Sequence, residues 1–296
     1  VAVGLRRLAR HALPSQQGAV FAWASVLSLF CAFSATNTGQ TNLHLVGFML
    51  QACADVIEKR WRRAAVWLWL GMLAKPIALV LILLCAALKR ELRWKLLVGA
   101  VVFAVLPFVH WDPAYASEQY GLAFQKLERA GQPGEKLYVN LYWLLRTVGL
   151  QIPESLRMPV AAVFALATLA ACWLGFRRRG AVRGAWLMTA LAACYMVLLS
   201  PRTETNTYVI LAPFVALSAA VALFLPGRRA AFFSLAAGAL ALGSDNYGRG
   251  FHALTQPWLK PLVAVLYAAW LLWPRRAAAS AEAGAWPDPS RVADTA

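Results

Sequence analysis

Nine apolar runs separated by short basic clusters constrain this chain more than any other feature of its sequence. A bilayer core about 30 Å thick needs about 20 helical residues, so runs of this kind predict membrane helices. With 60% hydrophobic and only 14% charged residues, the composition lies far from that of a soluble globular chain. The sequence therefore predicts an all-α fold, a polytopic integral membrane helical bundle over residues 18–273. The runs lie at 18–36, 43–57, 64–88, 96–110, 158–176, 184–199, 207–225, 230–244 and 258–273.

The basic clusters indicate how these runs cross the membrane, because Lys and Arg collect in cytoplasmic loops. If every run crossed once, the cluster at 89–95 and all later clusters would lie outside. If the run 64–88 instead enters and returns on the same side, every cluster is cytoplasmic. The net charge of +16 follows from these clusters, so membrane lipids rather than nucleic acid are the expected partners. The clusters are Arg6/Arg7/Arg10, Lys59/Arg60/Arg62/Arg63, Lys89/Arg90/Arg93/Lys95, Arg177/Arg178/Arg179/Arg183, Arg228/Arg229 and Arg275/Arg276.

Lys75 and Pro76 interrupt the run 64–88 near its middle. Proline removes a backbone donor and disfavours helix at the residue before it. Irregular backbone at membrane depth is tolerated only where it is buried in protein or lines a wet cavity. We therefore expect a broken re-entrant helical hairpin with Lys75 at its tip, facing a polar cavity. The alternative is one kinked helix whose lysine extends to an interface.

The segments outside the spans are expected to differ in character. Residues 1–17 predict a basic cytoplasmic segment, and residues 274–296, rich in Ala, Pro, Ser and Asp, predict a disordered cytoplasmic tail. In the long external loop 111–157, two aromatic amphipathic stretches at 120–131 and 137–150 predict short helices in the membrane interface.

Polar and metal-binding motifs within the spans are few. Asp55 precedes Lys59 by four residues, which predicts a local ion pair. No nucleotide-binding glycine motif or metal motif is found, so no metal and no cofactor is expected. The cysteines lie within apolar runs without C-x-x-C spacing, at Cys31, Cys53, Cys85, Cys172 and Cys194.

Lys75 is the first candidate binding residue, since a cation in hydrocarbon needs an anionic partner. No acidic residue of the chain is both deep in the membrane and on the outer side, which makes a ligand phosphate the expected partner. The segment "SPRTETNT" at 200–207 adds Arg202, which can hold phosphate in a bidentate fork. An ordinary solvated turn explains the same segment equally simply.

Other polar residues at the outer ends of the spans could contact a sugar or act on it. Glu204, Asn206 and Tyr208 can bond sugar hydroxyls, and Glu204 could serve as a base. In "NTGQTN" at 37–42, Gln40 and Asn42 could contact a ligand, although capping of the next helix by Thr41 or Asn42 is an equal reading. Asp112 lies just outside a span, where we expect it to cap a helix rather than to act as a catalytic group.

Together these residues resemble a known family. "GQTNLHLVGFMLQACADVIEKRWRRAAVWLWLGMLAKPIALVLILLCAALKRELRW" resembles the pattern of glycosyltransferase family 87. That pattern is a Gly-Gln-x-Asn start, a span, a basic turn, a small-residue-rich span ending in Lys-Pro, a hydrophobic return and a basic cluster. "LLSPRTETNTYVILAPF" is similar to the family's later Ser-Pro element, and "VNLYWLLRTVGL" to an Asn-led external stretch. The resemblance covers about residues 18–225.

The resemblance implies a multi-pass, C-superfamily glycosyltransferase of the cell inner membrane. Such an enzyme moves mannose or another hexose, with inversion, from a polyprenyl phosphate donor to a lipid or glycan acceptor at the periplasmic face. The chemistry needs a carboxylate to deprotonate the acceptor and cations to hold the leaving phosphate. Lys75 and Arg202 suit that phosphate.

The chain departs from the family at its start. Related enzymes place the catalytic acid in the first external loop, whereas "NTGQTN" matches a later element and has no carboxylate. The expectation is that the N-terminal helices with that acid are missing, and an active enzyme and an inactive truncated form are both open at this point. The catalytic residue is thus unassigned, with Glu204 and Asp112 as the remaining candidates.

Two other function classes fit parts of the pattern. Transporters and lipid flippases also build sites from broken helices near the midplane. They often show two matching interrupted helices, whereas the sequence predicts one Lys-Pro break, at Lys75-Pro76, without a counterpart in the later half. A non-catalytic membrane subunit fits the expected absence of an acidic loop.

Overall fold

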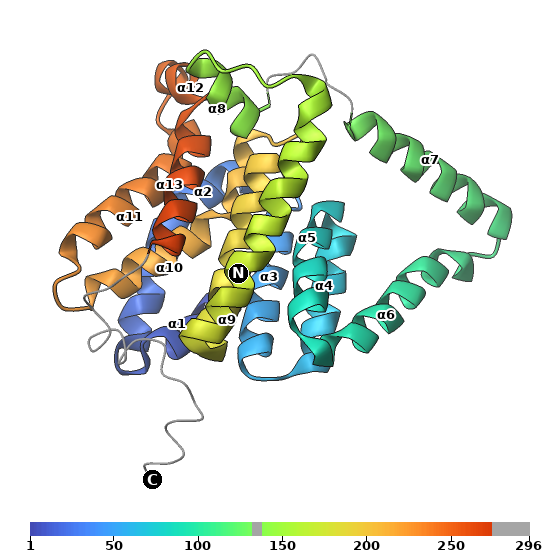
Figure 1. Cartoon of the computed structure of the whole chain (residues 1–296), viewed down its shortest axis with the longest axis horizontal. Coiled ribbons are helices and arrows are strands. Elements are labelled where there is room, and N and C mark those ends of the chain that lie inside the picture. The colour runs from blue at the N-terminus through green and yellow to red at the C-terminus, as the bar shows by residue number, and fades with distance from the viewer. Residues whose placement is uncertain (132–137, 274–296) are drawn as a thin grey trace, which may run out of the picture.

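The computed structural model describes residues 1–131 and 138–273, so the tail at 274–296, for which disorder was expected, lies outside the described residues. Within those residues the chain folds as an all-α membrane bundle without a strand (Figure 1). The helices are α1 Ala2–Ala12, η1 Pro14–Gln16, α2 Gln17–Asn37, α3 Asn42–Ile57, α4 Trp61–Ala74, η2 Pro76–Ala78, α5 Leu79–Leu88, α6 Arg90–Val105, η3 Leu106–Val109, α7 Pro113–Gly131, α8 Leu141–Thr147, α9 Glu154–Leu199, η4 Thr205–Ile210, α10 Ala212–Leu223, α11 Arg229–Leu242, η5 Ser244–Asn246, α12 Arg249–Thr255 and α13 Leu259–Leu272.

Three helical segments of the described chain are long and apolar enough to cross a membrane: Pro14–Asn37, Arg90–Val109 and Glu154–Leu199. The last of these, α9, is two helices joined at Gly180, whose φ of 79° lies in the left-handed region that favours glycine. The Tyr195 hydroxyl donates to the Ala161 carbonyl at 3.1 Å, so the two arms run antiparallel. The turn between them falls within the basic cluster 177–183, where the sequence placed a loop.

The helix break at Lys75 is confirmed. Helix α4 ends at Ala74, Lys75 is extended at φ −154° and ψ 132°, and Pro76 opens the short helix η2. Helix α5 then returns beside α4, so the chain enters and leaves this pair on one side (Figure 1). The hairpin closes tightly, because a Cβ on Gly71 would lie 3.5 Å from the Ala78 Cβ. A single kinked helix is excluded by this geometry.

Helix α6 begins where the hairpin ends and packs against the two helices of the hairpin. The Arg93 guanidinium donates to the Ala86 carbonyl at 2.9 Å, and the Trp69 indole donates to the Leu96 carbonyl at 3.2 Å. Beyond this contact α6 and α7 form an arm that stands away from the other helices (Figure 1). Tyr120 on α7 folds back on α6 by donating to the Ala104 carbonyl at 2.8 Å.

Both helices expected in the loop 111–157 are present. Helix α7 covers the first stretch, and α8 begins after Asn140, whose side chain accepts from the Trp143 amide at 3.3 Å. Their place in the membrane interface stays a prediction.

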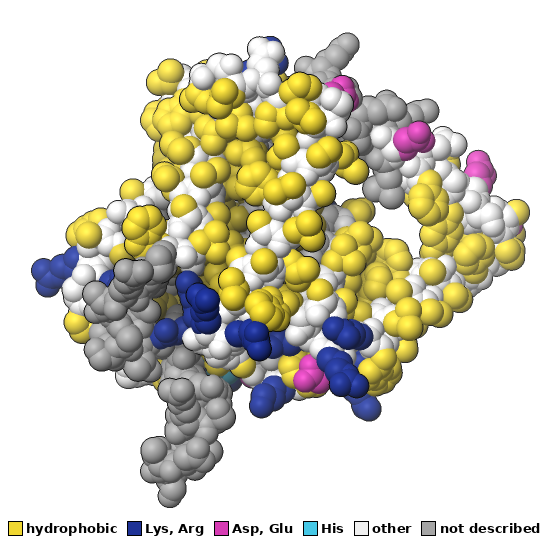
Figure 2. Space-filling model, viewed as in Figure 1, with side chains coloured by type: hydrophobic (Ala, Val, Ile, Leu, Met, Phe, Trp, Pro, Cys, Tyr) yellow, Lys and Arg dark blue, Asp and Glu magenta, His cyan; other side chains and the backbone are white. Residues whose placement is uncertain are grey.

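Lys and Arg side chains gather along one side of the molecule, the lower edge in Figure 2. We call this side the basic face and define it by the clusters 59–63, 89–95 and 177–179, which lie at the ends of α3, α5 and the first arm of α9. The acidic side chains visible in Figure 2 lie mostly toward the opposite side. The side remote from the basic face carries the turn 37–42 and the Lys75 break, and we call it the opposite face.

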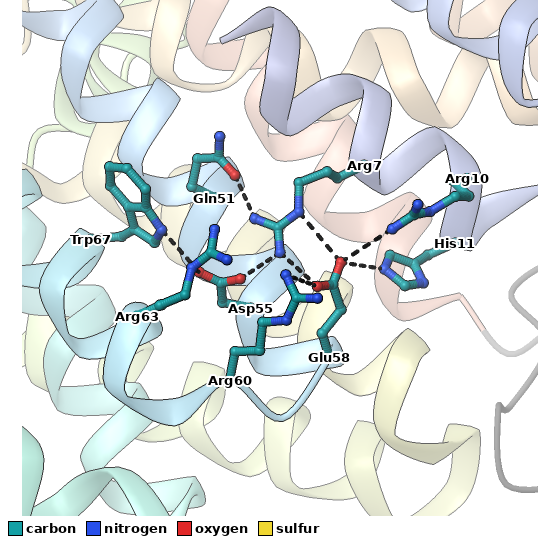
Figure 3. A network of polar contacts seen from close by, with 9 residues as sticks. All are labelled: Arg7, Arg10, His11, Gln51, Asp55, Glu58, Arg60, Arg63 and Trp67. Atoms are coloured by element: carbon teal, nitrogen blue, oxygen red, sulfur yellow. Dashed lines mark hydrogen bonds and ion pairs between the residues drawn. The ribbon is translucent and has the colours of Figure 1, made fainter.

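Residues 1–17, expected as a basic segment, include the amphipathic helix α1, which buries Leu5, Leu8, Ala9 and Ala12 in the bundle. Its Arg7 forms an ion pair with Asp55, a carboxylate without solvent exposure on α3 (Figure 3). Asp55 also accepts from the Trp67 indole at 2.9 Å and lies 3.5 Å from Arg63. The expected pairing of Asp55 with Lys59 is wrong, because the chain has left the helix by Lys59, where φ is 56°.

Glu58 is the second carboxylate of this network and joins α1 to the end of α3 (Figure 3). It lies 2.9 Å from Arg7, 3.0 Å from Arg60, 3.0 Å from His11 and 3.6 Å from Arg10. Burial alone would raise the pKa of Glu58, but the hydrogen bonds from Arg7 and His11 and the charges of Arg7 and Arg60 lower it to about 2.

Glu58 should therefore make the stability of the protein depend on acid pH. A carboxyl whose folded pKa is about 2, against an ordinary value of 4.5, stabilises the fold above pH 4.5. That contribution, on the order of 3 kcal/mol, should be lost as the pH falls from 4.5 toward 2. Thermal unfolding in detergent should show this decline in the wild type and a smaller one in Glu58→Gln. An equal decline in both proteins would remove Glu58 as its source.

A candidate site at the Lys75 helix break

Three segments far apart in the sequence meet at the opposite face: the turn 37–42, the break at Lys75 and the loop 200–206. The turn is tied to the break because the Thr41 hydroxyl donates to the Ala74 carbonyl at 3.2 Å. The turn is tied to the loop because the Asn42 amide donates to the Asn206 carbonyl at 3.4 Å. The sequence motifs that were singled out separately thus form one constellation.

A chain of side-chain hydrogen bonds runs across this constellation. The Asn42 amide donates to Gln40 Oε1 at 2.6 Å, and Gln40 Nε2 donates to Glu204 Oε2 at 2.9 Å. Glu204 also caps η4, since its side chain accepts from the Thr207 amide while its own amide donates to the Thr207 hydroxyl at 3.3 Å. The carboxylate is therefore held in place although its residue is exposed.

The Lys75 ammonium lies close enough to Glu204 for the two charges to attract each other. Among the described residues, however, this ammonium forms no hydrogen bond and no ion pair. The absence of an acidic residue that is both deep in the membrane and on the outer side stays a prediction, and the loop 200–206 brings the exposed Glu204 near Lys75. Because Lys75 and Glu204 do not form an ion pair with each other, both side chains can bind a group of a ligand.

Two buried amide oxygens face no protein donor in the described chain. Asn42 is fully buried and Asn206 is 9% exposed, and the Oδ1 atom of each lacks a hydrogen-bond partner. Buried polar atoms usually have a partner in protein or water. These oxygens suit the hydroxyl groups of a bound sugar or ordered water.

Of the other predicted residues, Arg202 lies on the loop 200–206, whereas Tyr208 and Asp112 make contacts outside the constellation. Tyr208 is fully buried, and its hydroxyl donates to the Val139 carbonyl at 2.9 Å. Arg202 is exposed on the same loop as Glu204. Asp112 caps α7, because its Oδ1 accepts from the Ala114 amide at 2.9 Å, and its corner of the arm lies far from the hairpin (Figure 1). The structure thus brings together Lys75, Gln40, Asn42, Asn206 and Glu204 but not Asp112.

Sequence reasoning missed the support beneath the loop. Lys260, 2% exposed, donates to the Thr205 carbonyl at 2.9 Å and to Asp245 Oδ2 at 2.6 Å. Asp245 in turn lies 3.0 Å from His252. The dipeptide Lys260-Pro261 was the available signal, although it is no counterpart of the helix break at Lys75-Pro76. The second Lys-Pro does not break its helix, since Pro261 lies in the first turn of α13.

No group of three or more His, Cys, Asp or Glu side chains within the described chain could hold a metal ion. The five cysteines are buried and unpaired.

The pattern of glycosyltransferase family 87 matches residues 1–201. The fold and this match define a membrane glycosyltransferase, and the chain belongs to glycosyltransferase family 87. No curated protein and no solved structure matches the sequence. Lys75, Gln40 and Asn42 lie within the matched region, whereas Glu204, Asp245 and Lys260 lie beyond it. The match begins earlier and ends earlier than the expected range of 18–225.

Proposed function

We propose that this protein transfers a hexose, with mannose as the first expectation, from a polyprenyl phosphate donor to a lipid or glycan acceptor. The single observation that carries the proposal is the Lys75 ammonium, held at a helix break without a direct partner in the described chain and beside Glu204. A sugar phosphate on a membrane lipid brings an anion to this depth, which a soluble nucleotide sugar does not. The family membership supports the reaction class.

Lys75 is proposed to hold the phosphate that leaves when the sugar is transferred. The 14 residues of α4 rise about 21 Å from the basic face, which supports a position for Lys75 in the outer half of a core about 30 Å thick. A fixed cation in a site of low dielectric stabilises developing negative charge more strongly than it would in water. Arg202, on the neighbouring loop, is proposed to add a second cation when the donor is bound.

Glu204 is proposed as the base that takes the proton from the acceptor hydroxyl as that oxygen attacks the anomeric carbon. The bond from that carbon to the phosphate oxygen breaks in the same displacement, so the phosphate leaves with its electron pair. Gln40 orients the Glu204 carboxylate. Asn42 and Asn206 supply buried amide oxygens for sugar hydroxyls.

Placing the basic face toward the cytoplasm opens this site toward the periplasm. Lys and Arg collect on the cytoplasmic side of membrane proteins, and the basic clusters of the described chain gather on one face (Figure 2). The proposed location is therefore the cell inner membrane, crossed several times, within the C-superfamily architecture.

The proposal is tested by donor consumption in membranes that contain the protein and their native acceptors. Polyprenyl phosphate mannose, polyprenyl phosphate glucose and nucleotide mannose are supplied separately, and their loss is followed by mass spectrometry. Loss of a lipid-linked donor in wild-type membranes but not in Lys75→Ala membranes is the expected result. Consumption of only the nucleotide sugar would contradict the proposal.

Replacing Glu204 with Gln should lower the rate by about 10²–10⁴-fold, because general base catalysis contributes that much. The amide keeps the shape and an acceptor oxygen for the cap, so the loop should stay folded. Glu118→Gln, an exposed carboxyl on α7, is the matched control and should keep the wild-type rate. Equal rates for Glu204→Gln and wild type would assign the base to another group.

A further inference from the structure

An apolar groove of about 420 Å³ lies between α4 and α6, away from Glu204. Its volume falls in the range of about 300–1,000 Å³ that is usual for ligand pockets. The floor is fixed by Trp69, whose indole donates to the Leu96 carbonyl at 3.2 Å and whose ring centre lies 5.3 Å from that of Phe103. The apolar lining includes Ala65, Leu70, Leu73, Val98, Val102 and Leu106.

The groove has one charged end. Arg62 and Lys95 line it where α4 and α6 begin, at the basic face, while Leu73 and Leu106 line its other end. Among the described residues Arg62 makes no hydrogen bond or ion pair. The Lys95 ammonium lies over the Trp94 ring and donates one hydrogen bond, to the Glu91 carbonyl at 2.8 Å. Two of its three N–H groups therefore can bind a ligand. An occupant of this groove should therefore carry negative charge at the basic face and hydrocarbon beyond it.

The dimensions of the groove match a single lipid leaflet. Arg62 and Leu73 are eleven positions apart on α4, which is a rise of about 16 Å, and one leaflet contributes about 15 Å of hydrocarbon. The exposed Trp94 lies beside the two cations, where tryptophan is enriched at the boundary between hydrocarbon and water. Clusters of Lys and Arg at a membrane surface attract anionic lipids.

We propose that this groove binds one anionic phospholipid of the leaflet on the basic face. The lipid phosphate lies against Arg62 and Lys95, and an acyl chain lies along Trp69 and Val102. The lipid fills the space between the re-entrant hairpin and the α6–α7 arm. This site is separate from the proposed donor site, and its test does not use transfer activity.

Native mass spectrometry of the protein in detergent tests the site with palmitoyl-oleoyl phosphatidylglycerol and the matching phosphatidylcholine. Wild type should keep one phosphatidylglycerol about 25-fold more tightly than phosphatidylcholine, since each surface cation contributes about fivefold. Arg62→Gln/Lys95→Gln should lose that preference. Val98→Trp, which fills the groove but keeps both cations, should weaken the binding of both lipids.

Arg177→Gln/Arg178→Gln is the matched control, because it removes the same charge from the basic face outside the groove. This control should keep the wild-type preference. An equal loss in both double variants would show attraction to the whole basic face and would overturn the site. Displacement of phosphatidylglycerol by equimolar polyprenyl phosphate would assign the groove to the donor chain and would also overturn it.

Discussion

Lys75→Met is expected to lower the transfer rate by about 10²–10³-fold, the usual loss when one fixed group that stabilises developing charge is removed. The same change should not weaken membrane insertion, since a lysine in hydrocarbon is unfavourable by about 2.5–3.5 kcal/mol on insertion scales. The variant should thus lose activity without losing stability. Lys75→Arg should keep part of the rate because it retains the charge.

The measurement is donor consumption per folded protein, with folding checked by thermal unfolding in detergent. Lys126→Met removes an exposed lysine of α7 and is the control that should keep the wild-type rate. A wild-type rate for Lys75→Met would remove this lysine from the site. A rate that falls only as far as the folded fraction falls would make its role structural.

Lys260→Met is expected to destabilise the fold by about 3 kcal/mol, because it removes the cation that pairs with the buried Asp245 carboxylate and leaves only Ser34 and His252 beside it in the described chain. Lys260 is 2% exposed and Asp245 10% exposed, and their atoms lie 2.6 Å apart. The loss should appear in unfolding by sodium dodecyl sulfate titration. It should also lower the transfer rate, because the Thr205 carbonyl that Lys260 holds precedes Asn206 and follows Glu204.

The double variant Asp245→Asn/Lys260→Met separates the charge from the packing. Without a buried unpaired charge it should recover most of the lost free energy of unfolding. The Thr205 carbonyl would still lack its donor, so the transfer rate should recover less than the stability. If the double variant is as unstable as Lys260→Met, the ion pair does not explain the effect.

Much of the helix arrangement could be predicted because hydrophobic length and basic clusters act locally. The dipeptide Lys75-Pro76 predicted the helix break, and the basic cluster 177–183 predicted a loop between two spans, where the structure has the turn at Gly180. Helix α1 was not predicted, because its contacts to α3 depend on Arg7 meeting Asp55 and Glu58 across the fold. A spacing rule along one helix cannot find such a partner.

The candidate site was predicted in parts and not as a whole. Lys75, Gln40 and Glu204 were each singled out, but their meeting depends on how α3, the hairpin and η4 pack. Tyr208 was chosen for its hydroxyl, which the structure uses within the core. Lys260 was missed because it begins an apolar helix and has no polar neighbours on its own helix that would mark it.

The hairpin that turns at Lys75 is the central claim, and cysteine labelling in intact cells tests it most directly. In a background with the five buried cysteines replaced by alanine, Arg62→Cys precedes the hairpin, Glu91→Cys follows it, and Thr38→Cys lies on the opposite face. An impermeant maleimide should label position 38 at once and positions 62 and 91 only after the membrane is opened. Labelling of position 91 from outside, while position 62 stays protected, would mean that residues 64–88 cross the membrane and would contradict the proposed site.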